Sequence, residues 1–290
     1  MKQCLRSFPG FKMKKVSFTK MVASGNDFVV IGCKVAGNLS LLARKVCDRK
    51  FGIGADGLLV LDKSRVADVR MRIFNADGSE AEMCGNGARC AAMFTGPKVK
   101  SLETMAGLIG VKVNGDKVGV NLTKPHGLQL DIPIIVEGRA LGVNFINTGV
   151  PHAVIFASGL KDIEITAIAR PIRYHKHFSP RGTNVDFVEV LGKSAIMVRT
   201  YERGVEDETL ACGTGSAASA LIFAIKSGVR DKIMVHTRGG EVLRVSFKRE
   251  GLNFNEVWLE GKAQVVYKGV YYVYGFDRSD SHSVSRREIR

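Results

Sequence analysis

The chain has 290 residues, of which 45% are hydrophobic and 24% are charged, and these proportions are typical of a folded globular protein. No apolar run approaches the roughly 18 residues that a membrane-spanning helix needs, so we expect no membrane as a partner. The formal charge of +15 suggests nucleic acid, but Lys and Arg are dispersed and form no stripe with interleaved aromatic residues, which favours a solvated basic surface instead.

The ends of the chain and its cysteines predict where the protein is found. The first 15 residues contain five Lys and Arg residues and no acid, and they lack the apolar core and cleavage site of a secretory signal. We expect residues 1–13 and 277–290 to be flexible extensions. Six cysteines without a secretory signal do not predict a disulfide framework, and their spacing matches no common zinc site. We therefore expect a cytoplasmic protein with reduced thiols, no metal and no other cofactor.

Short runs of alternating apolar and polar residues predict β-strands with one buried face, joined mostly as antiparallel hairpins. A helix is predicted at 40–50 with Ser40 as its N-cap, and a shorter one follows Cys84 and ends at Gly96-Pro97. A third helix is predicted at 214–228, ending at Gly228. The predicted strands include 69–76, 110–122, 187–192 and 195–202.

The two halves of the chain repeat each other. SGNDFVVIG at 24–32 is similar to GTNVDFVEVLG at 182–192, and the segment 71–94 is similar to 198–223. This repeat predicts an α+β fold of two pseudo-symmetric domains, each a mostly antiparallel sheet or barrel wrapped around a central helix, with an active-site cleft between them. The expected domains are 14–128, completed by 266–276, and 129–265.

Each repeat contains Cys-Gly-x-Gly before a run of small residues, as MCGNGARC at 83–90 and as LACGTGSA at 210–217. The glycines allow close approach of a ligand, and the first N–H groups of a helix have no partner inside the helix. Such a helix end binds anions and lowers the pKa of a cysteine placed there. Two such ends could hold one carboxylate between them, with Cys84 and Cys212 on either side of the attached carbon.

This arrangement suits inversion at the α-carbon of an amino acid without a pyridoxal or metal cofactor. A thiolate on one face would remove the α-proton, and a thiol on the other face would return a proton. The helix ends would stabilise the charge that moves into the carboxylate. For one copy alone, a buried inert cysteine is the better interpretation, because cysteine is often buried. Two copies at equivalent places in a repeat favour catalysis.

The chain resembles the diaminopimelate epimerase family over nearly its whole length, from about Lys14 to about Gly275. Proline racemases, which are related, carry a histidine where Asn86 stands. The stretches that carry the resemblance are GNDFVV (25–30), FGIGADGLLVL (51–61), FNADGSEAEMCGNGARC (74–90), GVPHAV (149–154), GTNVDFVEV (182–190) and ERGVEDETLACGTGSAA (202–218).

The resemblance implies a fold, an activity and a role for each matching residue. The fold is that of a diaminopimelate epimerase, and Cys84 and Cys212 are the expected acid/base pair. They would interconvert LL- and meso-diaminopimelate in lysine and peptidoglycan precursor biosynthesis. Asn26 is expected near the reacting centre, and His152 is a possible site residue or a structural histidine. The reacting carboxylate is expected on the backbone of Gly85, Asn86, Gly213 and Thr214, and the distal group on Asn75, Asn184, Glu202 and Arg203.

One departure and two alternatives remain open. Many family members have an asparagine that binds the distal group where this chain has Val150, so one hydrogen bond to the substrate is missing or supplied elsewhere. An enzyme of the same fold that acts on another amino acid, such as proline or hydroxyproline, is the first alternative, and a non-catalytic basic binding protein is the second. We expect a homodimer that binds a small-molecule substrate and neither nucleic acid nor membrane.

Overall fold

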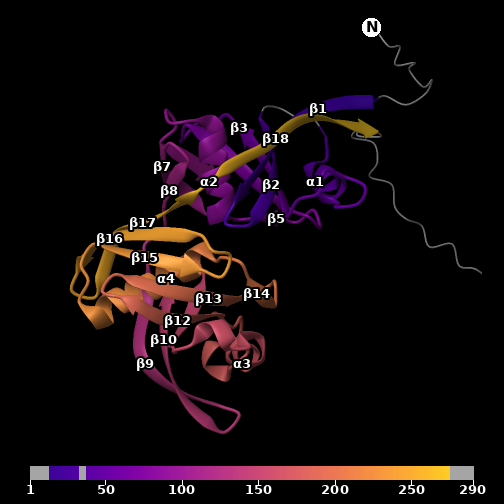
Figure 1. The fold of residues 1–290 in the computed structure, drawn as a ribbon. Coiled ribbons are helices and arrows are strands. Elements are labelled where there is room, and N and C mark those ends of the chain that lie inside the picture. The colour runs from indigo at the N-terminus through magenta and orange to yellow at the C-terminus, as the bar shows by residue number, and fades with distance from the viewer. Residues whose placement is uncertain (1–12, 33–36, 275–290) are drawn as a thin grey trace, which may run out of the picture.

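The computed structural model describes residues 13–32 and 37–274. Figure 1 shows two lobes that lie one above the other. The N-terminal lobe holds the elements up to β8 (Lys117–Asn121) and the last strand, β18 (Gln264–Tyr274), and the C-terminal lobe holds those between. The fold is mixed α/β and mostly strands. The four α-helices among the described residues are α1 (Leu39–Cys47), α2 (Gly85–Thr95), α3 (Ile165–Arg173) and α4 (Gly213–Ser227), and none is long and apolar enough to cross a membrane.

The strands follow the predicted alternation of buried and exposed side chains most clearly in the C-terminal lobe, for example in β16. The other strands of the N-terminal lobe are β1 (Met13–Ala23), β2 (Asn26–Gly32), β3 (Gly57–Asp62), β4 (Val69–Asn75), β5 (Glu80–Ala81), β6 (Ser101–Thr104) and β7 (Gly107–Asn114). The C-terminal lobe contains β9 (His126–Val136), β10 (Arg139–Asn147), β11 (Pro151–Phe156), β12 (Asn184–Gly192), β13 (Ala195–Glu202), β14 (Asp207–Thr209), β15 (Lys232–Thr237), β16 (Val242–Glu250) and β17 (Asn253–Lys262).

Most neighbouring strands are antiparallel, as predicted, but four pairs are parallel: β2–β3, β4–β6, β11–β12 and β13–β15. A parallel pair needs a crossover connection. The helices α1, α2, α3 and α4 lie in these four crossovers, one in each and in chain order. Both lobes therefore use the same succession of strand, helix, strand, strand, helix and strand, in agreement with the sequence repeat.

The last strand returns to the start of the chain. β18 pairs antiparallel with β1, with Met13 opposite Tyr274 and Val22 opposite Gln264. A second pairing, of β8 with β17, connects the two lobes directly. The predicted domain limits at 128/129 and 265/266 fall inside β9 and β18, and the predicted extensions lie outside the described residues except for Met13.

The helix ends follow local capping chemistry. The N-cap of α1 lies two residues earlier than predicted, because the side chain of Asn38 accepts a hydrogen bond from the Leu41 N–H at 3.1 Å, and the helix ends at Cys47 and not at residue 50. The prediction of Ser40 as the N-cap is therefore wrong, and Ser40 lies in the first turn of the helix. α4 ends at Gly228, whose φ of 78° permits the left-handed cap that was predicted from the sequence.

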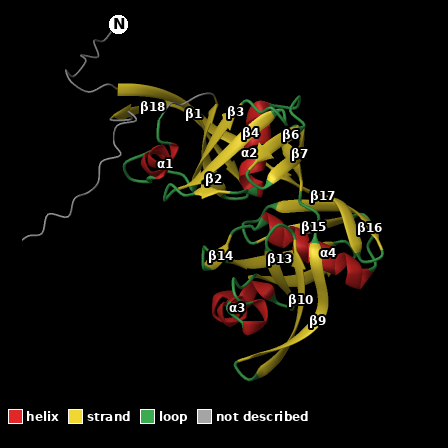
Figure 2. Cartoon of the chain, turned by 180° about the vertical axis from the view of Figure 1, so that it is seen from behind, coloured by secondary structure: helices red, strands yellow, loops and turns green. Residues whose placement is uncertain are grey.

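One continuous core crosses both lobes. It contains alanines of α2 and α4 and apolar side chains from strands of both lobes. The two helices contact each other. Figure 2 shows α2 and α4 among the strands, whereas α1 and α3 lie outside them on one side of the molecule. Two smaller apolar clusters attach α1 and α3 to the sheets. The small side chains of α2 and α4 let strands approach these helices closely.

An ion-pair cluster beside the β1–β2 turn supports a stability prediction. Burial raises the pKa of Asp27, but hydrogen bonds from Arg49 and Lys20 together lower it by more than burial raises it. The resulting pKa is about 2. This group stabilises the fold above its unfolded pKa near 3.8 and stops doing so as the pH falls through about 2. We expect Asp27→Asn to lower the free energy of unfolding at pH 6 and to match the wild type at pH 2, measured by urea unfolding. Asp62→Asn, at the exposed end of β3, is the control, and an equal loss at both pH values would contradict the prediction.

Candidate active site

The two predicted cysteines occupy the same structural position. Cys84 is the N-cap of α2 and Cys212 is the N-cap of α4, and both have extended backbone conformations. The Sγ of Cys84 accepts a hydrogen bond from Gly87 N at 3.4 Å, and the Sγ of Cys212 accepts one from Gly215 N at 3.4 Å. The sequence repeat is therefore also a repeat of local geometry, in which each sulfur lies at the start of a helix.

The loop that carries Cys212 lies against the β1–β2 turn of the other lobe, which also contacts Cys84. A side chain on Gly25, in the β1–β2 turn, would approach within 2.7 Å of Leu210, which lies two residues before Cys212. Burial raises the pKa of both Cys84 and Cys212, and the negative charge of Glu202 adds to this effect on each. A single carboxylate thus acts on both thiols across the boundary between the lobes.

Cys84 lies against the β1–β2 turn of its own lobe. Its Sγ donates to Asn26 Oδ1 at 3.7 Å, and Asn26 Nδ2 donates to Asp56 Oδ2 at 2.7 Å. This geometry places the predicted residue Asn26 at the thiol. A Cβ built on Gly85, the residue after the cysteine, would meet nothing within 4 Å. Gly85 therefore leaves open space beside the sulfur, as a ligand that approaches the backbone requires.

The other glycines of the two motifs serve packing instead. A side chain on Gly87 would lie 3.2 Å from Leu59, and one on Gly213 would lie 2.8 Å from Leu259. At Gly215 a side chain would collide with the carboxylate of Asp186. The prediction that the glycines admit a ligand is therefore limited to Gly85, and the rest are required by neighbouring strands.

Cys212 belongs to a buried polar chain. Its Sγ lies 3.4 Å from Thr214 Oγ1, which lies 3.0 Å from His152 Nε2. His152 Nδ1 lies 2.7 Å from Asp186 Oδ2, and both side chains are completely buried. Thr200 donates to the other oxygen of Asp186 at 2.7 Å. His152 is thus part of the Cys212 environment, where it holds the hydroxyl of Thr214 in place.

Glu202 also lies in this environment. Burial raises the pKa of its carboxyl, while hydrogen bonds from Thr209 and Cys212 lower it. The Thr209 Oγ1 to Glu202 Oε1 distance is 2.5 Å. The carboxyl of Glu202 is therefore fixed by β14 beside the second thiol, in a position where it can exchange a proton with that thiol.

The pKa values of the thiols differ from the sequence prediction. Burial raises the pKa of Cys84, and hydrogen bonds from the Gly87 and Asn86 backbone only partly offset this effect. Burial raises the pKa of Cys212 well above the usual value, helped by the charges of Glu202 and Asp186. The expected lowering at a helix end is real but smaller than the cost of charging a sulfur out of water.

The carboxyl of Glu202, which was predicted to bind the distal group, lies beside Cys212, and the other three residues of that prediction lie in two places. Asn184 is buried, accepts from Arg203 N at 2.8 Å and donates to Pro151 O at 3.0 Å, so its amide connects β12 to the start of β11. The guanidinium of Arg203 forms no ion pair among the described residues, because Glu206 pairs with Arg173 instead. Arg203 is therefore available for an added carboxylate. Asn75, by contrast, closes the turn after β4, where its Nδ2 donates to Ser79 Oγ at 2.9 Å.

Three charged residues of the site were missed in the sequence. Arg89 and Asp186 are completely buried, and Glu241 comes from the other lobe to meet Arg89. An Arg inside a helix of small residues and an Asp inside the apolar run of β12 were visible signals, because a buried charge needs a partner. Nothing in the sequence pattern connects Glu241 with Arg89, which is 152 positions away.

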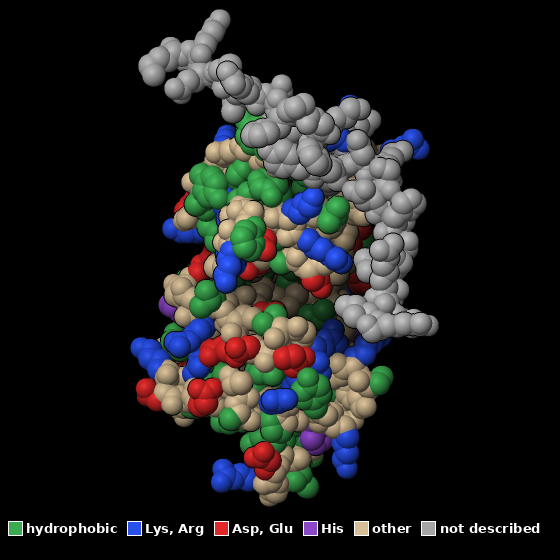
Figure 3. Space-filling model, turned by 90° about the vertical axis from the view of Figure 1, so that its right-hand side faces the viewer, with side chains coloured by type: hydrophobic (Ala, Val, Ile, Leu, Met, Phe, Trp, Pro, Cys, Tyr) green, Lys and Arg blue, Asp and Glu red, His purple; other side chains and the backbone are tan. Residues whose placement is uncertain are grey.

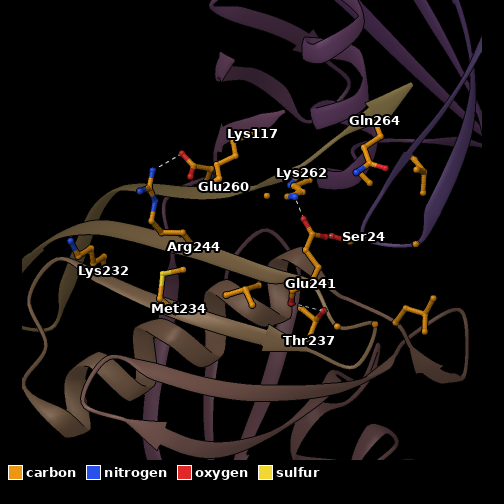
Figure 4. A pocket seen from close by; sticks show the side chains of 18 residues that line it. Ser24, Lys117, Lys232, Met234, Thr237, Glu241, Arg244, Glu260, Lys262 and Gln264 are labelled. Atoms are coloured by element: carbon orange, nitrogen blue, oxygen red, sulfur yellow. Dashed lines mark hydrogen bonds and ion pairs between the residues drawn. The ribbon is translucent and has the colours of Figure 1, made fainter. Parts of the chain in front are cut away.

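A pocket of about 730 Å³ lies between the lobes beside this site. Figure 4 shows Ser24, Glu241 and Lys262 on one side of it and Lys232 and Arg244 on the other. Neither cysteine lines it. Figure 3 shows a hollow between the two lobes on one face, around which Lys and Arg lie interspersed with Asp and Glu.

Comparison with known proteins identifies the family. A family model described as diaminopimelate epimerase matches residues 18–126 and 144–266. The chain is 42% identical over 275 residues to a diaminopimelate epimerase of Aquifex aeolicus, covering 88% of this chain and 97% of the relative. It is 42% identical over 280 residues to a diaminopimelate epimerase of Methanothrix thermoacetophila, covering 89% and 96%.

Solved structures show the same fold at low identity. A hydroxyproline epimerase from Agrobacterium vitis, with bound trans-4-hydroxy-L-proline, superposes with a TM-score of 0.67 at 16% identity, covering 91% of this chain and 94% of that one. A phenazine biosynthesis protein of the PhzF family from Bacillus anthracis superposes with a TM-score of 0.64 at 17% identity, covering 90% and 99%. The fold is thus shared with these proteins, and by its sequence the chain belongs to the diaminopimelate epimerase family.

Proposed function

We propose that the chain is a diaminopimelate epimerase that interconverts LL- and meso-diaminopimelate with Cys84 and Cys212 as its acid/base pair. The observation that carries the proposal is the repeated geometry, in which each cysteine caps a helix and the two caps come from different lobes. In this proposal the lobes are pseudo-symmetric domains, each a sheet around one central helix, and the active-site cleft lies between them.

In the proposed reaction the α-carbon loses a proton on one face and gains a proton on the opposite face. One sulfur, as thiolate, takes the α-proton and becomes a thiol, and the electron pair of the broken C–H bond moves into the adjacent carboxylate. The other sulfur, as thiol, gives its proton to the opposite face of the carbon and becomes a thiolate. The N–H groups of Gly85, Asn86, Gly213 and Thr214 lie in the first turns of the helices, and in this proposal they stabilise the carboxylate charge.

The charges around the two sulfurs differ, and this difference indicates which of the two thiols is the more acidic. Arg89 lowers the pKa of Cys84, whereas Asp186 raises that of Cys212, and Glu202 raises both. Burial raises the pKa of both sulfurs, but that of Cys212 more, so Cys84 is the more acidic thiol. We assign to Cys84 the thiolate of the reacting pair and to Cys212 the thiol. For the other direction, Glu202 would take the proton of Cys212 and the Cys84 thiolate would take a proton from water, so that the two sulfurs exchange roles.

Deuterium uptake tests the function directly. LL-diaminopimelate incubated with the protein in heavy water should gain deuterium at one α-position as the meso form appears, because the returned proton comes from a thiol that exchanges with solvent. Proline should gain none. Uptake into proline alone would instead favour a racemase of the same fold, and nucleic-acid binding without any exchange would favour the basic binding protein.

Arg203 is proposed to bind the distal carboxylate, with Asn184 holding its backbone and Asn75 at the periphery. Its free guanidinium suits a carboxylate, and charged hydrogen bonds of this kind contribute about 1.5–3 kcal/mol. We expect Arg203→Met to lower kcat/KM for diaminopimelate by about ten- to a hundredfold, mainly through KM. Arg230→Met, at the far end of α4, is the control. An unchanged kcat/KM would assign distal recognition elsewhere, for example to the region of Val150.

We further propose a cytoplasmic homodimer. β18 exposes apolar side chains, and Val270 and Tyr272 lie on one face of it at 47% and 39% exposure. A second copy of the chain would cover this face and remove apolar surface from water. We expect the wild type to sediment as a dimer and Val270→Lys to shift it toward the monomer in a concentration series. A monomeric wild type would refute this assembly.

A further inference from the structure

Arg89 is a charged side chain at a place where the repeat has none. It lies in α2, five residues after Cys84, and is completely buried. The residue five positions after Cys212 is Ala217, which is also completely buried. A guanidinium out of water is costly unless it is paired and hydrogen-bonded. The N-terminal cysteine helix therefore carries a cation that its counterpart in the repeat does not need.

The guanidinium of Arg89 joins four segments of the chain. Its Nη2 donates to Asn86 Oδ1 and to Ser24 Oγ, both at 2.6 Å. Its Nη1 donates to Lys262 O at 3.0 Å and to Glu241 Oε1 at 3.3 Å. Four of its five N–H groups are thus used, and only Nε–H lacks a partner among the described residues. The planar fork of the side chain is held in one orientation.

Glu241 brings the C-terminal lobe into this network. Its Oε1 accepts from Lys262 N at 2.6 Å, and its Oε2 accepts from the hydroxyl of Ser24. Figure 4 shows the Glu241 side chain pointing toward Ser24 and Lys262 on the wall of the pocket between the lobes. A carboxylate from the residue just before β16 therefore binds both the β1–β2 turn and the helix that follows Cys84.

The groups that Arg89 holds lie on two sides of Cys84. Asn86 is in the first turn of the helix, and Ser24 lies two residues before Asn26, whose Oδ1 accepts from the Cys84 thiol. Arg89 touches neither the thiol nor the space above Gly85. It therefore acts on the reacting sulfur through the field of its charge and through the neighbours that it holds, and not by direct contact.

The other cysteine is positioned by different means. Thr214 stands in α4 where Asn86 stands in α2, and its hydroxyl is held by His152 and, behind it, Asp186. All of these residues belong to the C-terminal lobe. A buried basic side chain paired with a carboxylate thus lies beside each cysteine loop, Arg89 with Glu241 and His152 with Asp186. Only the Cys84 loop has a carboxylate that comes from the opposite lobe.

We propose that Arg89 and Glu241 are positioning residues that set the Cys84 loop relative to the lobe that carries Cys212. The inference rests on the proposed two-cysteine reaction and adds to it. A base and an acid on opposite faces of one carbon must keep a fixed separation, and a misplacement of about 1 Å can cost a hundredfold in rate. The pair connects the lobes at the base of one cysteine loop and so fixes this separation.

Gly261 provides a second way to disturb the pair. A side chain there would collide with Arg89 Nη1, would meet Leu243 Cδ2 at 2.5 Å, and would come within 2.8 Å of Glu241 Oε1. The φ of Gly261 is not positive, so the position needs glycine for space and not for its backbone conformation. Gly261→Ala should therefore displace Arg89 from Glu241 without changing any charge.

The main test uses Arg89→Met/Glu241→Met, which leaves no unpaired buried charge. Wild type and variant are compared for kcat and KM on LL-diaminopimelate, for thermal unfolding, and for the rates at which iodoacetamide alkylates Cys84 and Cys212, resolved by peptide mass spectrometry. We expect kcat to fall on the order of a hundredfold with KM little changed. We expect alkylation of Cys84 to slow by about tenfold, because a nearby cation favours the thiolate, while that of Cys212 stays the same.

The outcomes separate this inference from the proposed function and from a merely structural role. Wild-type kcat in the double variant, or equal effects on both thiols, would overturn the inference. If the double variant does not fold, Gly261→Ala decides in the same way: selective slowing at Cys84 supports the pair, and an unchanged Cys84 overturns it. Glu260→Gln, which frees Arg244 in the same pocket, should change neither thiol. Alkylation needs no substrate, so a wild type that is inactive on diaminopimelate refutes the function and leaves this test valid.

Discussion

Alanine in place of Cys84 or Cys212 is expected to abolish inversion, with turnover falling on the order of 10⁴-fold or more. Each sulfur supplies a step that no neighbour can replace, because proton removal and proton return occur on opposite faces of the carbon. Serine in either position should leave at most a trace, since a hydroxyl is a much weaker acid and base at neutral pH. The measurement is conversion of LL- to meso-diaminopimelate, followed by chromatography.

Two other cysteines provide matched controls. Cys47 and Cys90 are buried, and burial raises the pKa of each to about 12. Neither caps a helix, so Cys47→Ala and Cys90→Ala should retain near wild-type turnover. Full activity in Cys84→Ala or Cys212→Ala would refute the two-thiol mechanism, and loss of activity in the control variants would point to a general effect on folding.

Removal of Asp186 is expected to have the largest effect on stability. Asp186→Ala leaves His152 without its partner at 2.7 Å and Thr200 without its acceptor, and both side chains are buried. Breaking one partner of a buried pair of this kind costs about 3–5 kcal/mol. We expect a loss of that size in urea unfolding, together with lower turnover because Thr214 is no longer held beside Cys212.

A surface pair offers the comparison for this variant. Asp131 forms an ion pair with Lys226 at 2.7 Å, but the Asp131 side chain is 72% exposed. Exposed pairs contribute little because water screens them. Asp131→Asn removes the charge and keeps a residue that tolerates the φ of 51° at this position, so it should leave both stability and turnover close to those of the wild type. A small effect of Asp186→Ala would mean that His152 and Thr214 are held by other contacts.

The sequence was sufficient to predict the features that depend on local pattern. Alternating side chains gave the strands, Gly96 and Gly228 gave the ends of two helices, and the repeated Cys-Gly-x-Gly gave the two helix caps. It was not sufficient for the four parallel strand pairs, because one-sided burial has the same period of two in parallel and antiparallel sheets. The start of α1 was missed for a similar reason, since both Asn38 and Ser40 are good N-cap residues.

The site was predictable where one motif holds all of its parts, and less so where distant segments meet. The positions of Cys84, Cys212 and Asn26 followed from motifs. The raised pKa values of the thiols did not, because burial is a property of the folded molecule and outweighs the helix end. The role of Glu241 could not be predicted either, because it depends on the ion pair with Arg89 of the other lobe.

The pairing of β18 with β1 has a consequence for how the chain matures. The N-terminal sheet includes β18, a strand about 240 residues after β1 in the chain, so its edge stays open until the ribosome has synthesised β18. Until then β1 presents unsatisfied amides that could pair with a strand of a neighbouring nascent chain. A stop codon placed just before Gln264 should therefore yield an aggregating product, even though it removes neither cysteine.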